Sequence, residues 1–175
     1  QAGHAAGGGP RIAASENTVV PYDGTTPPSF PGALDPDDST FRRPTDCVAL
    51  SPATAVAYDT LTLVSNASST RQISVFTSPI GQPYLSCDDG HDTVLTLYSA
   101  AGFDPSNPLA GCLAVNDDYA PITRCSLVSF NLPAGETRTV VIAGAADAAA
   151  SGGLFPYQVN FNYDFPVELI DFTIT

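Results

Sequence analysis

Short runs of β-branched, aromatic and other apolar residues alternate with polar residues along most of the chain. Asp, Asn, Gly and Pro separate the runs, a pattern typical of antiparallel strands rather than of helices or βαβ units. The runs span residues 55–64, 71–76, 93–98, 113–115, 126–132, 138–143, 157–163 and 167–174. We therefore predict an all-β protein, a two-sheet antiparallel β-sandwich with a jelly-roll-like arrangement.

The N-terminal quarter of the chain has a different composition. Residues 1–10 are rich in Gly and Ala and predict a flexible leader. Residues 21–46 hold six of the 16 prolines. We predict an extended Gly- and Pro-rich arm at residues 1–46, followed by a sandwich domain at residues 47–175 with an extra C-terminal strand. The arm contains one β-prone patch, formed by Asn17, Thr18, Val19 and Val20.

The charge of the chain excludes several classes of partner. It contains no lysine, and six arginines stand against 18 acidic residues, for a net charge of −12. Such a surface repels nucleic acids and anionic membranes. No apolar run approaches the roughly 20 residues needed to cross a bilayer, so we expect no membrane insertion. The chain begins at Gln1 and lacks methionine, so we expect that a secretory signal has been removed and that the protein is extracellular or at the cell surface.

The cysteine count supports an oxidising compartment. Cys47, Cys87, Cys112 and Cys125 are an even set without a C-x-x-C spacing, which favours disulfides over a zinc site. Three pairings are possible. We favour Cys112–Cys125, which would join the two ends of the intervening loop, and this leaves Cys47–Cys87 as the second bond.

Two clusters of oxygen-bearing side chains lie in predicted loops, at opposite ends of two strand regions. Carboxylate and amide oxygens are the ligands that calcium takes, so calcium is the one cofactor that the sequence suggests. The alternative is turn chemistry, in which Asp and Asn side chains bind their own backbone. The spacing of an EF-hand loop is absent. The candidate metal ligands are Asp88, Asp89, Asp92, Asn116, Asp117 and Asp118.

Signals for catalysis are weak, and we expect no enzyme. His91 lies between Gly90 and Asp92, but the chain has no Gly-x-Ser-x-Gly motif and no lysine. The tyrosines and phenylalanines fall on predicted strands, where core and cross-strand packing is their usual role. Asn66 begins an Asn-Ala-Ser sequon on a predicted turn, which can be glycosylated or can remain an unmodified turn.

Several motifs lie between residues 50 and 163: Asp92-Thr93-Val94-Leu95-Thr96-Leu97-Tyr98, Asn116-Asp117-Asp118, Ser126, Ala134-Gly135-Glu136-Thr137, and Gly153 with the closing strand 157–161. In their order and spacing they resemble the bacterial pre-peptidase C-terminal (PPC) domain. That resemblance implies a small, secreted, non-catalytic jelly-roll-like sandwich, usually attached to an extracellular hydrolase, and some relatives bind calcium, collagen or polysaccharide. Within these 175 residues, long extensions flank the expected sandwich on both sides, and no catalytic domain accompanies it.

The edges of the predicted sandwich suggest a function. Natural sheets commonly protect their edges with lysine, and this chain has none. A strand donated to a neighbour's open edge would satisfy both backbones and generate a homopolymer. We therefore expect a non-catalytic secreted structural protein that forms a filament or surface structure by exchange of strands or arms. The alternative is a calcium-dependent adhesion or substrate-binding module, associated with a secreted hydrolase, whose ligand is a polysaccharide or a protein.

Overall fold

The computed structural model describes residues 18–20, 29–52, 55–65, 67–82, 87–88, 90–119, 123–145, 154–163 and 170–174. These residues form strands and loops, and all eight strands predicted from the sequence are confirmed. The strands are β1 (Thr18–Val20), β2 (Ser29–Ala33), β3 (Thr40–Phe41), β4 (Pro44–Asp46), β5 (Ala49–Leu50), β6 (Val56–Ser65), β7 (Arg71–Ser78), β8 (Thr93–Tyr98), β9 (Cys112–Asn116), β10 (Leu127–Leu132), β11 (Thr137–Gly144), β12 (Pro156–Tyr163) and β13 (Ile170–Ile174).

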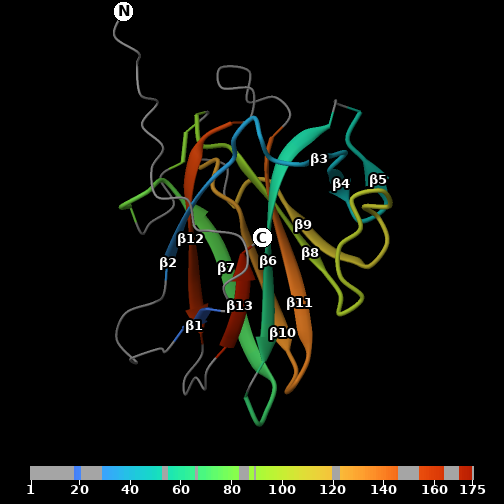
Figure 1. Ribbon diagram of the computed structural model, residues 1–175, viewed down its shortest axis with the longest axis vertical. Helices are drawn as coiled ribbons and strands as arrows, with labels where there is room; N and C mark the ends of the chain where they lie inside the picture. The colour runs from blue at the N-terminus through green and yellow to red at the C-terminus, as the bar shows by residue number, and fades with distance from the viewer. Residues whose placement is uncertain are drawn as a thin grey trace, which may run out of the picture.

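The strands form two packed antiparallel sheets, which confirms the predicted β-sandwich (Figure 1). The larger sheet has the order β1-β13-β6-β11-β8-β9, with β3 also paired to β6. The smaller sheet has the order β10-β7-β12-β2, and β4 and β5 form a separate hairpin. From β6 to β13 the chain changes sheet at every connection except the one between β8 and β9, as in jelly-roll-like sandwiches.

The core lies between the two sheets and follows the period-2 alternation of the strands. On β7, for example, Ile73 and Val75 are fully buried while Gln72 is exposed. Strand β8 is the exception, because all six of its residues are buried. Its outer side is covered by a second apolar cluster that contains Phe41 and Tyr98.

The predicted arm requires a correction, because residues 29–46 are part of the sandwich. Strand β2 pairs with β12 in the smaller sheet, and β3 pairs with β6 in the larger one. The hairpin β4–β5 spans the expected boundary between residues 46 and 47. Proline lowers strand propensity, but Pro31 is tolerated because β2 lies at the edge of its sheet. The partly buried Phe30 and the buried Leu34 anchor this segment in the core.

The β-prone patch of the N-terminal segment does form a strand. Thr18, Val19 and Val20 make up β1, which pairs antiparallel with β13 of the same chain, and Asn17 lies outside the described residues. Strand β13 in turn pairs with β6 from Leu61 to Ser65. The first and last described strands therefore lie together at one edge of the larger sheet (Figure 1).

All four cysteines form disulfides, but the predicted pairing is wrong. The bonds are Cys47–Cys112 and Cys87–Cys125. Cys47 lies in the turn of the β4–β5 hairpin, and β4 packs against β9, which begins at Cys112. Proximity along the chain was a poor guide because the partners are brought together by the packing of elements far apart in sequence. Two disulfides fit an extracellular protein.

Candidate functional site

The two predicted acidic loops converge at one end of the larger sheet. Asp92 directly precedes β8, and Asp117 and Asp118 directly follow β9. Because β8 and β9 are antiparallel neighbours, with Leu95 opposite Asn116, the start of one strand lies beside the end of the other. One carboxylate oxygen from each of the three aspartates lies within 4.8 Å of the others. The loops are therefore adjacent, not at opposite ends as the sequence suggested.

Two arginines partly neutralise this aspartate cluster. The Arg124 guanidinium lies 3.0 Å from an Asp118 carboxylate oxygen and 4.0 Å from one of Asp92. The Arg43 guanidinium lies 3.6 Å from an Asp117 oxygen. Asp92 is buried, whereas Asp117 and Asp118 are exposed. As it stands, the cluster is an ion-pair network, and a cation entering it would have to displace Arg124 from Asp118.

The Asn116 side chain makes hydrogen bonds to the backbone of this region. Its side-chain oxygen accepts a hydrogen bond from the Leu127 amide at 2.8 Å, and its side-chain nitrogen donates to the Asp118 carbonyl at 3.3 Å. The buried Ser126 hydroxyl contacts the Thr93 and Asp117 carbonyls. These bonds hold the turn after β9 against β8 and β10, which is the turn chemistry weighed as the alternative to calcium.

Asp88 and His91 form a separate turn. A carboxylate oxygen of Asp88 accepts a hydrogen bond from the Gly90 amide at 3.0 Å and lies 2.8 Å from the His91 ring nitrogen. These bonds lower the pKa of the Asp88 carboxyl, with the His91 contact as the largest cause. The His91 ring also packs edge-on against Phe155. Asp88 does not belong to the aspartate cluster, and Asp89 and Asn66 lie outside the described residues.

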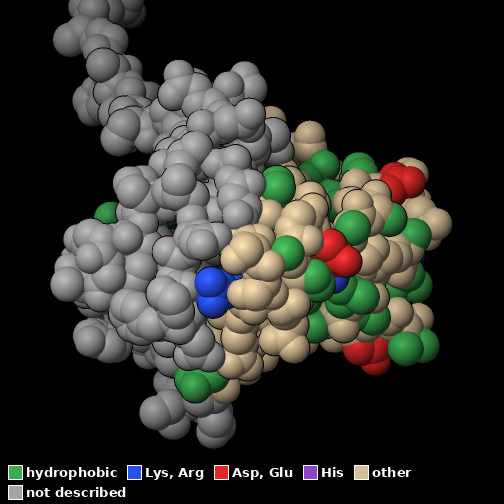
Figure 2. Space-filling model, turned by 90° about the horizontal axis from the view of Figure 1, so that it is seen from below, with side chains coloured by type: hydrophobic (Ala, Val, Ile, Leu, Met, Phe, Trp, Pro, Cys, Tyr) green, Lys and Arg blue, Asp and Glu red, His purple; other side chains and the backbone are tan. Residues whose placement is uncertain are grey.

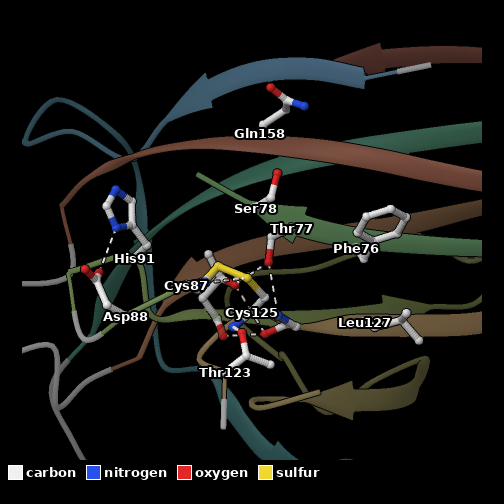
Figure 3. The surroundings of a disulfide bond; sticks show 12 residues. Phe76, Thr77, Ser78, Cys87, Asp88, His91, Thr123, Cys125, Leu127 and Gln158 are labelled. Atoms are coloured by element: carbon white, nitrogen blue, oxygen red, sulfur yellow. Dashed lines mark hydrogen bonds and ion pairs between the residues drawn. A yellow bond between two sulfur atoms is a disulfide. The ribbon is translucent and has the colours of Figure 1, made fainter. Parts of the chain in front are cut away.

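Figure 3 shows the buried disulfide Cys87–Cys125. It joins the segment that leads into Asp92 to the residue that directly follows Arg124. The Arg124 amide donates to the Cys87 carbonyl at 3.2 Å, and the Cys87 amide contacts the Cys125 sulfur at 3.1 Å. Thr77 and Thr123 make further hydrogen bonds around it. Sequence reasoning missed the roles of Arg124 and Arg43, although their being two of only six cations in the chain was an available signal.

No protein-family model and no curated protein matches the chain. Among the described residues there is no helix of the length and apolarity that a membrane span requires.

On the face shown in Figure 2, hydrophobic side chains are scattered among polar atoms and acidic side chains lie at separate points. The described residues on that face form no continuous apolar patch of the kind that marks a permanent interface.

Proposed function

We propose that the protein is a secreted, non-catalytic structural protein that self-assembles by exchanging terminal strands between sandwich subunits. The observation that carries the proposal is the position of β1 and β13. They lie outermost on one side of the larger sheet, and they come from the two terminal parts of the described chain. A terminal strand at a sheet edge can be supplied by a neighbouring copy without altering the rest of the sandwich.

The acceptor in this proposal is the edge of β6. Its inward-facing residues Leu61, Leu63 and Ser65 are almost fully buried, and β13 pairs with the segment that contains them. This edge needs a strand to satisfy its backbone hydrogen bonds, and the register is the same whether the strand comes from the same copy or from another. A head-to-tail series of such exchanges gives a filament rather than a closed dimer.

Two other sheet edges are protected in ways that suit a role for β6 as the exchange site. The hairpin β4–β5 lies beside the edge strand β9 and is tied to it by Cys47–Cys112. Strand β2, at the edge of the smaller sheet, carries Pro31, which cannot donate a backbone hydrogen bond. Both features are known means of blocking strand addition.

A cysteine pair placed across β6 and β13 tests the exchange directly. Thr62 and Thr173 are opposite each other in the register of the two strands. In the variant Thr62→Cys/Thr173→Cys, we expect oxidation to link different chains, giving a ladder of covalent oligomers on a non-reducing gel that collapses to one band on reduction. Electron microscopy of the untreated protein should show filaments.

The matched control is Gln72→Cys/Asn131→Cys, which joins registered partners on β7 and β10 within the body of the sandwich. It should give only intrachain bonds. A Thr62→Cys/Thr173→Cys protein that oxidises entirely within single chains, together with isolated particles in the microscope, would contradict strand exchange.

A calcium-dependent binding module is the second candidate, favoured by the convergence of Asp92, Asp117 and Asp118. For this candidate we expect calcium at a hundredfold excess over its Kd to raise the Tm by about 5–10 °C. The shift should disappear in Asp117→Asn/Asp118→Asn and persist in Asp104→Asn, a change at an exposed aspartate elsewhere. Arg124→Gln should tighten binding, because it removes the cation that competes for Asp118. An unchanged Tm with calcium in both the native chain and Arg124→Gln excludes the site.

A further inference from the structure

The larger sheet directs one carboxylate into the space between the sheets. Asp59 lies on β6 between the inward-facing Ala57 and Leu61, and its partner on β11 is the buried Ile142. It accepts a hydrogen bond at 2.5 Å from the hydroxyl of Tyr157, on strand β12 of the smaller sheet. This hydrogen bond therefore joins a side chain of the larger sheet to one of the smaller sheet, and its acceptor, Asp59, can ionise.

Strand β2 rests on the tyrosine that makes this contact. Gly32 lies opposite Tyr157 in the β2–β12 register. A Cβ atom at position 32 would come within 2.4 Å of the Tyr157 ring, so the ring lies directly against the β2 backbone. The position of β2 on the sandwich therefore depends on the position of the Tyr157 ring. That position is fixed in part by the hydrogen bond from the Tyr157 hydroxyl to Asp59.

The loop that follows β2 brings more acidic groups to the same place. Asp35 and Asp38 lie in this loop, and the next residue, Ser39, accepts a hydrogen bond from the Tyr58 amide beside Asp59. Burial is the main cause that raises the pKa of Asp59 to about 6; the Tyr157 hydrogen bond opposes the rise, and Asp38 and Asp35 add to it. The pKa of Tyr157 is raised well above its usual range, so its hydroxyl remains a donor at all moderate pH values.

We propose that ionisation of Asp59 is a pH-sensitive switch for the docking of β2, with β2 seated on β12 when Asp59 is protonated and loosened when it is charged. A charged Asp59 gains solvation and moves away from Asp35 and Asp38 when β2 and its loop lift off the sandwich. The switch concerns a single chain and does not require assembly. Its consequence for assembly, the release of β2 from β12 at higher pH, rests on the proposed strand exchange.

Hydrogen exchange of the β2 amides measures the switch when each observed rate is divided by the intrinsic rate of an unprotected amide at the same pH, which gives a protection factor free of the intrinsic pH dependence of exchange. An acid that titrates near 6 when docked and near its usual value when released makes opening about tenfold more favourable at pH 8 than at pH 5. We expect the protection factors of the β2 amides to fall about tenfold from pH 5 to pH 8 in the native chain. In Asp59→Asn the β2 protection factors should be the same at both pH values.

Two further variants separate this switch from a general loosening of β2. Tyr157→Phe removes the hydrogen bond that favours the ionised carboxylate of Asp59. The loss of β2 amide protection between pH 5 and pH 8 should therefore be larger in this variant than in the native chain. Asp37→Asn makes the same charge change at an exposed position in the loop and should retain the tenfold effect. The proposal is overturned by equal β2 protection at both pH values in the native chain, or by an undiminished pH effect in Asp59→Asn. Because every readout is taken on single chains, failure here is distinguishable from failure of strand exchange.

Discussion

Replacing Cys87 and Cys125 together by alanine is expected to lower the free energy of unfolding by about 5 kcal/mol. The bond closes a loop of 38 residues, and loop-closure entropy alone accounts for about 4 kcal/mol of this value. The remainder comes from packing, since Cys87 and Cys125 are 7% and 0% exposed and the alanines would leave a cavity. Urea denaturation followed by circular dichroism gives the measurement.

The matched control is Cys47→Ala/Cys112→Ala, which removes the partly exposed disulfide. Its loop is longer, at 65 residues, so loop entropy alone would make this bond the more stabilising one by about 0.5 kcal/mol. We expect the opposite order, because Cys87 and Cys125 are buried whereas Cys47 and Cys112 are only partly buried, so the cavity left by alanine costs more at Cys87–Cys125. A larger loss for the Cys47–Cys112 variant would show that loop closure dominates and that the packing around Cys125 contributes little.

The strands could be predicted because each carries its own signal. The alternation in β6 and β7 and the punctuation around β10 and β11 are local, and all were confirmed. Strand β2 escaped prediction because Pro31 and Gly32 weaken its propensity, while the interactions that hold it are its pairing with β12 and the contact with Tyr157. Those interactions join residues far apart in the chain, and no local pattern records them.

The site residues show the same division. The sequence identified Asp92, Asp117 and Asp118 by type, but only the antiparallel pairing of β8 with β9 brings them together. The ion pairs of Arg124 with Asp118 and of Arg43 with Asp117 depend on loop positions that residue spacing does not encode. The disulfide partners were mispredicted for this reason too. The residue types could be read from the sequence, but which residues form ion pairs or disulfides with one another could be read only from the fold.

Asp59 was not singled out from the sequence, yet its substitution by asparagine should stabilise the protein by about 2–3 kcal/mol at pH 8. The folded pKa of about 6 exceeds the usual 3.8, so between these values the folded state binds more protons than the unfolded state. The free energy of unfolding of the native chain therefore falls as the pH rises from 3.8 to about 6. At higher pH it is lower by the whole of the about 2–3 kcal/mol given above. Asparagine keeps an oxygen that can accept the Tyr157 hydrogen bond and never becomes charged.

The measurement is a series of urea titrations of the native chain and Asp59→Asn from pH 4 to pH 8. The two stability curves should nearly coincide at pH 4, where the native carboxyl is largely protonated, and diverge through pH 6. Asp37→Asn, an exposed change in the nearby loop, should run parallel to the native curve. A constant offset across the whole range would mean that asparagine merely packs better at position 59. If Asp59→Asn is instead less stable than the native chain at pH 8, the ionised carboxylate strengthens the hydrogen bond to Tyr157 by more free energy than its burial costs. The charge on Asp59 would then stabilise the contact between the two sheets.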